Sequence, residues 1–197
     1  MSFILASGSA SRQRILNDAG VPFRAVPPDL DEGILKQALF REHTPREKIA
    51  GALADAKALA VSNQYPDALV LGGDQTLLFE EDLIDKSTDL AQARSLLARL
   101  RGKEHMLVGA LSLARGGAVL WRHAETAQLW MRHFSDAFLD RYLATEGTGV
   151  LSAVGCYKLE GLGAQLFHRI KGDYFSILGL PLLPLLAELR KQGVIAK

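Results

Sequence analysis

The stretch ALVLGGDQTLLF, residues 68–79, places a pair of glycines and an aspartate directly after an apolar run. A short apolar run bounded by turn-forming residues predicts a strand that is buried on both faces. We expect this strand to break at the glycines and a second extended stretch to follow. Asp74 would then stand at the end of a buried strand, where α/β proteins place metal ligands and general bases. The alternative is an aspartate that only shapes a turn beside its glycine neighbours.

Helices and strands alternate around this stretch. Residues 45–62, 89–102 and 135–147 combine good helix formers with capping or terminating residues, and each segment predicts a helix. Residues 105–132 predict two long strands joined by a turn at Arg115-Gly116-Gly117. Alternating elements of this kind predict an α/β fold in which flanking helices cover a mixed central sheet.

The length and charge of the chain bound its architecture. With 197 residues, 48% of them hydrophobic, the chain can bury the core of a single domain, which we expect to span residues 1–197. We expect residues 80–104 to hold the boundary between two lobes of that domain. The formal net charge of +1 gives no reason to expect a nucleic-acid or membrane surface.

The sequence favours a reduced compartment. Cys156 is the single cysteine, so no internal disulfide can form. Arg12 and Arg14 interrupt any apolar region of a signal peptide, and no apolar run reaches the roughly 18 residues of a membrane span. The apolar segment 177–189 is broken by two prolines and predicts a buried helix. We therefore expect a cytoplasmic protein.

A serine-rich segment precedes two arginines near the start of the chain. Residues 3–8 predict a strand, LASGSASRQRIL (5–16) leads from it into a helix, and residues 23–29 predict a further strand. Backbone N–H groups at such a helix start bind anions. Arg12 or Arg14 would be repelled by the helix dipole there, which suggests that one of them grips a phosphate. A plain serine cap followed by solvated arginines is the alternative.

Further charged positions are candidates with weaker signals. Lys57 lies among the alanines and leucines of a predicted helix, where it either reaches out to solvent or points into a cleft as a phosphate ligand. Asp31 and Glu32 follow two prolines and offer a second carboxylate for a hard cation, although most such pairs belong to surface loops. Lys86 has no informative neighbours by itself.

The later part of the chain is rich in glycine. Glycines in residues 155–182 permit tight turns or close approach to a ligand, but their spacing matches neither a dinucleotide-binding fingerprint nor a P-loop. The five histidines are scattered and, with one cysteine, give no zinc-binding spacing. We expect His105 and His123 to lie on the surface of strands. No Gly-x-Ser-x-Gly sequence supports a serine hydrolase.

Together these segments resemble the Maf family, the septum-formation-like nucleoside triphosphate pyrophosphatases, over nearly the whole chain. LASGSASRQRIL is similar to the family's Leu-Ala-Ser-x-Ser-Pro-x-Arg-x-x-Leu-Leu pattern, ALADAKA to its lysine helix and DLDE to its acidic segment. LGGDQTL is similar to its Gly-x-Asp-[Thr or Gln] strand end. YKLEGLGAQLF and KGDYFSILGLPL resemble its glycine-rich segment and the entry into its last helix.

The resemblance implies two lobes around a nucleotide cleft, as in Maf and inosine-triphosphatase-like folds. It also implies hydrolysis of a nucleoside triphosphate to the monophosphate and pyrophosphate, and a homodimer. A divalent cation, Mg²⁺ or Mn²⁺, is implied as cofactor, with Glu32 and Asp74 as its ligands. Asp74 matches the catalytic aspartate, taken as the proton acceptor. The positions that match phosphate contacts are Ser7, Arg12, Lys57 and Lys86.

Three positions are linked in the family with the choice of nucleotide, and here they are Ser11, Gln75 and Glu160. The branch that acts on 7-methyl-GTP resembles Trp, Gln and Glu at these positions, whereas the dTTP/UTP branch carries Arg, Thr and Gln. The chain is closer to the first branch, although Ser11 fits neither. The chemistry of Glu160 agrees, because a carboxylate accepts both adjacent N–H donors of a guanine-type base.

Two other functions stay open at this point. One is a nucleotide-binding regulator of cell division with little turnover. The other is a phosphatase or a sugar-nucleotide transferase that shares an α/β phosphate cup. The product separates these functions, because they yield, respectively, no product, orthophosphate or a sugar adduct, whereas the expected enzyme releases pyrophosphate.

Overall fold

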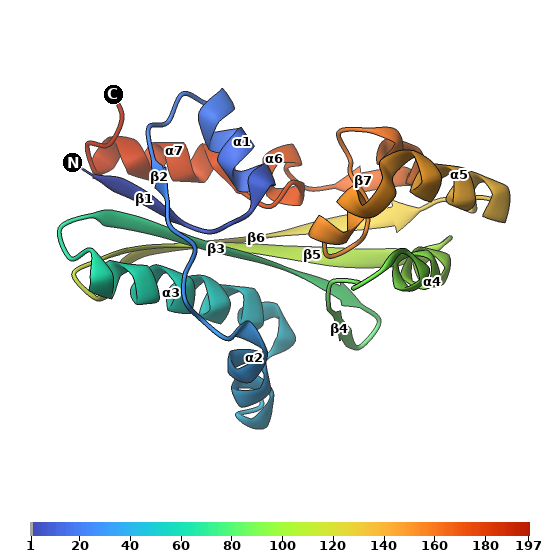
Figure 1. Ribbon diagram of the computed structural model, residues 1–197, viewed down its shortest axis with the longest axis horizontal. Coiled ribbons are helices and arrows are strands. Elements are labelled where there is room, and N and C mark those ends of the chain that lie inside the picture. Colours follow the sequence, from blue (N-terminus) through green and yellow to red (C-terminus); the bar gives the residue numbers. More distant parts are fainter. Residues whose placement is uncertain (1) are drawn as a thin grey trace. The chain divides into compact units, whose positions relative to one another are not determined.

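The computed structural model describes residues 2–197, and within them seven strands form one sheet in the order β2-β1-β3-β5-β6-β7, with β4 paired to β3 (Figure 1). The strands are β1 (Phe3–Ala6), β2 (Arg24–Ala25), β3 (Leu69–Phe79), β4 (Asp82–Ile84), β5 (Glu104–Arg115), β6 (Ala118–Met131) and β7 (Phe167–Lys171). Because β1 pairs parallel with β2 and β3 while β7 pairs antiparallel with β6, the sheet is mixed. The predicted α/β class is confirmed.

Helices connect most of these strands. They are α1 (Ala10–Asp18), α2 (Glu32–Arg41), α3 (Arg46–Gln64), α4 (Leu90–Leu100), α5 (Asp136–Glu146), α6 (Tyr174–Ile177) and α7 (Leu182–Lys191), together with the 3₁₀ helices η1 (Gly147–Ser152) and η2 (Leu162–Leu166). No helix within residues 2–197 is both long enough and apolar enough to cross a membrane.

The chain forms two compact units. Unit 1 consists of the residues up to Gln75, Gly109–Glu125 and Tyr174–Lys197, and unit 2 of Thr76–Val108 and Thr126–Asp173. The predicted lobe boundary at residues 80–104 is therefore wrong, since that whole segment belongs to unit 2. The chain instead passes from one unit to the other inside the long strands β3, β5 and β6, and once more between β7 and α6.

Alternation along β3 assigns its side chains in unit 1 to two faces. Leu69 and Leu71 join the apolar cluster with helices α1 and α7, whereas Val70 packs with Val61 of α3. Figure 1 shows α1 and α7 on one side of β1 and β3 and α3 on the other. Since successive strand residues point to opposite faces, Asp74 belongs to the α3 face and Gln75 to the face of α1 and α7.

The two glycines do not interrupt β3, contrary to the prediction. The first of them has a packing role instead, because the neighbouring elements leave no room for a side chain there. A Cβ atom on Gly72 would overlap the backbone of Ala54 and Ala58 in α3. Glycine therefore allows α3 to pack directly against the strand, with both alanines buried. This close approach brings the middle of α3 to the position of Asp74, two residues further along β3 on the same face.

Other differences from the prediction are local. The strand predicted at 23–29 is reduced to Arg24–Ala25, and helix α2 (Glu32–Arg41) occupies a segment for which the sequence predicted no element. In unit 2, His105 is buried rather than on a strand surface. The reason is tertiary packing, because its imidazole Nε2 lies 2.9 Å from the Tyr157 hydroxyl and its ring packs beside Tyr157 and Phe167.

Candidate active site

The serine-rich turn between β1 and α1 holds Arg12 inside unit 1. Ser9 caps α1, and the Arg12 side chain turns inward, with 8% of the residue exposed. Its Nη1 donates to Ser7 Oγ at 3.2 Å, and its Nε donates to the Gly179 carbonyl at 2.8 Å. Arg14 is exposed. The alternative of two solvated arginines is therefore wrong for Arg12, whose guanidinium is buried.

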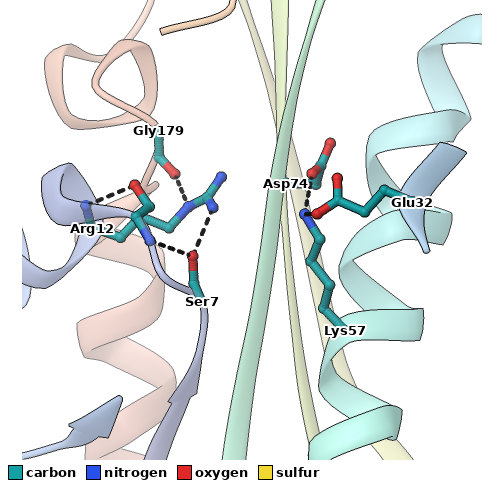
Figure 2. A network of polar contacts seen from close by, with 7 residues as sticks. Ser7, Arg12, Glu32, Lys57, Asp74 and Gly179 are labelled. Atoms are coloured by element: carbon teal, nitrogen blue, oxygen red, sulfur yellow. Dashed lines mark hydrogen bonds and ion pairs between the residues drawn. The ribbon is translucent and has the colours of Figure 1, made fainter. Parts of the chain in front are cut away.

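A second charged group lies on the α3 face of β3. The Lys57 ammonium is 2.6 Å from Asp74 Oδ1 and 2.9 Å from Glu32 Oε1, so one lysine joins carboxylates from β3 and α2 (Figure 2). Lys57 is only 6% exposed, which rules out the solvent-reaching alternative. Asp74 lies within the strand and is 7% exposed, so it is not a turn residue. Glu32 begins α2 and keeps about half of its side chain in solvent.

Electrostatics connect the two groups, which Figure 2 shows on opposite sides of β3. Burial lowers the pKa of the Arg12 guanidinium, and the negative charges of Asp74 and Glu32 oppose that shift. Arginine stays protonated in proteins even so. Two cations and two carboxylates therefore balance one another in this part of unit 1, which makes the burial of their charges tolerable.

Ser11 and Gln75 lie on the same face as Arg12. Ser11 Oγ donates to the Leu178 carbonyl at 2.8 Å. Gln75 Nε2 donates to the carbonyls of Ser176 at 2.8 Å and Ile177 at 3.1 Å. Both predicted selectivity residues of unit 1 are thus attached to the end of helix α6 and the residue that follows it.

The other two predicted residues, Lys86 and Glu160, belong to unit 2 and are exposed. Lys86 lies between β4 and α4 and lines a hollow together with Ser87 and Arg99. Glu160 lies in the loop before η2.

The loop that carries Glu160 is anchored inside unit 2. The buried Tyr142 hydroxyl donates to the Cys156 carbonyl at 3.2 Å and accepts from the Lys158 backbone N–H at 3.2 Å. The Lys158 ammonium contacts Glu146 at 3.4 Å. Gly163 packs so closely on the backbone of Lys158 that a Cβ there would overlap it. The loop therefore has a defined backbone at the position from which Glu160 projects.

Sequence reasoning missed the residues that hold these side chains in place. Gly72 admits α3, and Gly179 has a φ of +101°, a left-handed conformation that favours glycine and aims its carbonyl at Arg12. The signal for Gly72 was its position two residues before Asp74 on the same strand face. For Gly179 it was the Gly-Leu-Pro sequence before the last helix.

The carboxylates of Asp74 and Glu32 suit a hard divalent cation. Within residues 2–197 no group of three or more His, Cys, Asp or Glu residues could hold a metal ion. Mg²⁺, however, is commonly held by one or two carboxylates, with water and substrate phosphates completing the shell. The Lys57 ammonium contacts both carboxylates at once, which shows that they converge on a single positive charge. The donor set therefore fits a metal that is shared with a phosphate ligand.

Comparison with known proteins places the chain in a family. Residues 2–192 match the family model described as Maf-like protein. The chain is 50% identical over 195 residues to the nucleoside triphosphate pyrophosphatase of Granulibacter bethesdensis, covering 99% of each chain. It is 48% identical over 192 residues to the 7-methyl-GTP pyrophosphatase of Mesorhizobium japonicum, covering 98% of this chain and 96% of that protein. The chain belongs to the Maf family.

Proposed function

We propose that this protein is a nucleoside triphosphate pyrophosphatase, which adds water across the α–β phosphoanhydride of its substrate and releases the monophosphate and pyrophosphate. The observation that carries the proposal is the buried charged group of Arg12, Lys57 and Asp74, completed by Glu32. Relatives that are about half identical along the whole chain are named for this activity.

The balance of charge explains how such a site would receive a triphosphate. The cations and carboxylates already neutralise one another, so a bound triphosphate adds negative charge that needs further compensation. A divalent cation, Mg²⁺ or Mn²⁺, held by Glu32 and Asp74, would supply that charge and polarise the phosphate oxygens.

The residues of unit 1 can take separate roles. The Arg12 guanidinium and the Ser7 hydroxyl present donors beside the start of α1, where phosphate oxygens would bind. The Asp74 ion pair uses Oδ1, so Oδ2 is the atom that would accept the proton of the attacking water. Lys57 holds Asp74 and Glu32 together and offers its positive charge to a phosphate oxygen. Lys86 in unit 2 remains a predicted phosphate contact.

For the nucleotide, we propose a modified, 7-methyl-GTP-like purine triphosphate. Gln75 donates its Nε2 hydrogens to two backbone carbonyls and Ser11 donates its hydroxyl hydrogen to a third, so the side-chain oxygens of both residues remain as acceptors for a ligand. Glu160 also offers acceptors only. A guanine-type base supplies the matching N–H donors, and a carboxylate favours the positive ring of 7-methylguanine. Some relatives are named for 7-methyl-GTP and others only for nucleoside triphosphates.

Product analysis tests the activity. The protein is incubated with 7-methyl-GTP, GTP, UTP and dTTP in Mg²⁺ or Mn²⁺, and the phosphate products are separated. We expect pyrophosphate and the monophosphate, with the highest kcat/KM for 7-methyl-GTP. Orthophosphate alone would indicate a phosphatase, and tight binding without product would favour the nucleotide-binding regulator. Activity that persists unchanged in a chelator would remove the metal from the proposal.

A homodimer and a cytoplasmic location complete the proposal. Light scattering during size-exclusion chromatography measures the mass of the assembly against the 21.4 kDa of one chain. Fractionation of cells that express the protein tests the location. We expect a mass of two chains and recovery in the cytoplasmic fraction.

A further inference from the structure

Four consecutive backbone carbonyls, those of residues 176–179, accept hydrogen bonds from side chains of the candidate active site. Gln75 Nε2 donates to the first two, Ser11 Oγ to the third and Arg12 Nε to the fourth. The segment begins with the last two residues of α6, and the last carbonyls of a helix have no partner within it. The side chains supply those partners, and the segment in return fixes where their remaining polar atoms point.

The segment is fixed in its turn by a carboxylate from β6. Ser176 is 5% exposed, and its Oγ donates to Glu125 Oε2 at 2.5 Å. The other oxygen of Glu125 lies 2.8 Å from His123 Nε2. The His123 ring stacks on Trp121 at 5.7 Å between centroids, and Trp121 packs against the apolar cluster of α1 and α7. A continuous chain of contacts therefore connects the core of unit 1 to Ser176.

We propose that Glu125 is a positioning residue of this site, which acts through Ser176 to hold the segment 176–179 and thereby the orientation of Arg12, Ser11 and Gln75. The proposal rests on the proposed function, because it concerns how the same site selects and holds its nucleotide. A glutamate that only stabilised the fold would change the melting temperature and leave the choice of nucleotide as it was.

The substitutions are chosen to separate positioning from folding. Glu125→Ala and Ser176→Ala each remove the 2.5 Å hydrogen bond, whereas Glu125→Gln keeps an acceptor oxygen for the Ser176 hydroxyl. Asp55→Ala is the matched control. Asp55 pairs with Arg122 of β6 at 2.8 Å, and its side chain is 24% exposed, against 28% for Glu125. Melting temperatures identify any variant that fails to fold. If Glu125→Ala does not fold, Ser176→Ala, which is the smallest change, still tests the proposal.

The main readout is the ratio of kcat/KM for 7-methyl-GTP to that for UTP. We expect Glu125→Ala and Ser176→Ala each to lower this ratio about tenfold, the scale of one hydrogen bond to a charged group. KM should rise more than kcat falls, because a misplaced Arg12 weakens binding first. The double variant should lower the ratio no further than either single variant does, because both changes remove the same hydrogen bond. Glu125→Gln should keep a ratio close to that of the wild type, and Asp55→Ala should change the ratio less than about twofold.

A second readout does not depend on turnover. The Arg12 Nε–H should exchange slowly with solvent in the wild type, because it is buried and bonded to Gly179, and faster in Glu125→Ala. A wild type that releases no pyrophosphate from any triphosphate would remove the proposed function, while the exchange rate still decides the positioning role. Unchanged exchange, or an unchanged nucleotide ratio in folded Glu125→Ala, would overturn the proposal.

Discussion

The buried polar groups of the two units differ in charge. In unit 1 they include Arg12, Lys57 and Asp74, which carry full charges and contact partners at 2.6–3.2 Å. In unit 2 they include His105 and Tyr157, whose uncharged forms share a hydrogen bond of 2.9 Å. Burial lowers the pKa of His105 to about 4 and raises the pKa of Tyr157.

The difference shows what each environment is suited to do. A buried charge costs several kcal/mol unless it is paired, so charges persist where a ligand or a reaction requires them. A neutral hydrogen bond between buried side chains orients the packing at much lower cost. The buried charges of Arg12, Lys57 and Asp74 in unit 1 are the groups that we expect to respond to a bound anion, whereas His105 and Tyr157 of unit 2 pack as neutral groups. The following experiments separate these two kinds of buried group.

The largest effect is expected at Asp74. Asp74→Asn keeps the size of the side chain but removes the charge that accepts a proton and contacts Lys57. Turnover should fall by about two orders of magnitude or more, the scale of a lost general base. Steady-state kinetics measure the loss, and circular dichroism confirms the fold. Asp55→Asn, which also removes a carboxylate from unit 1, serves as the control. Near-normal turnover in folded Asp74→Asn would show that Asp74 is not the general base.

The two arginines of α1 give the next contrast. Arg12→Ala removes a buried guanidinium and leaves the Gly179 carbonyl without its donor, whereas Arg14→Ala changes an exposed side chain. We expect kcat/KM to fall about fiftyfold for Arg12→Ala, the scale of a lost charge-assisted hydrogen bond, and less than about twofold for Arg14→Ala. The same assay with 7-methyl-GTP compares both variants. If Arg14→Ala proved the more damaging, the inward orientation of Arg12 would not matter for catalysis.

The burial of His105 leads us to expect that the free energy of unfolding, rather than the rate of the reaction, depends on pH. Its pKa falls from the ordinary 6.5 to about 4 in the folded state, so the unfolded chain binds the proton more readily between these values. The contribution of His105 to the free energy of unfolding is therefore fully present above about pH 6.5 and is lost as the pH falls toward 4. Between about pH 7 and pH 5 the loss should be about 2 kcal/mol.

Denaturant unfolding at a series of pH values measures this dependence. His105→Gln has no titrating imidazole, so its free energy of unfolding should fall less over the same range, which subtracts the contribution of the carboxylates. Parallel curves for the two proteins would show that the burial of His105 does not control stability.

The smallest effect is expected at Glu160. Glu160→Gln replaces one acceptor oxygen by a donor and suits a base with an acceptor beside a donor, such as uracil or thymine. The ratio of kcat/KM for 7-methyl-GTP to that for UTP should fall about tenfold, the scale of one hydrogen bond. The hypothesis fails if the wild type prefers UTP, or if the variant stays active with the same ratio.

The sequence was informative where a residue type carries the chemistry. Arg12, Lys57 and Asp74 stood out because a charge beside an apolar or serine-rich segment is unusual, and the structure brings two of them into contact. The continuity of β3 through its glycines was not predictable in this way, since it depends on the close approach of α3. The burial of His105 depends on Tyr157, 52 residues away. The segment 176–179 accepts hydrogen bonds through backbone carbonyls, which every residue has, so the Gly-Leu-Pro sequence marks Gly179 but does not identify its partners.

The bond between Arg12 and Gly179 also constrains when the site can form during protein synthesis. These residues are 167 positions apart, and Ser11 is equally far from its partner, Leu178. Translation produces α1 early, but the carbonyls that orient it emerge only after residue 179 has left the ribosome. A nascent chain that already displays Asp74 and Lys57 thus has no oriented Arg12. The hydrogen bonds that orient Arg12 and Ser11 therefore form only after both segments have been synthesised.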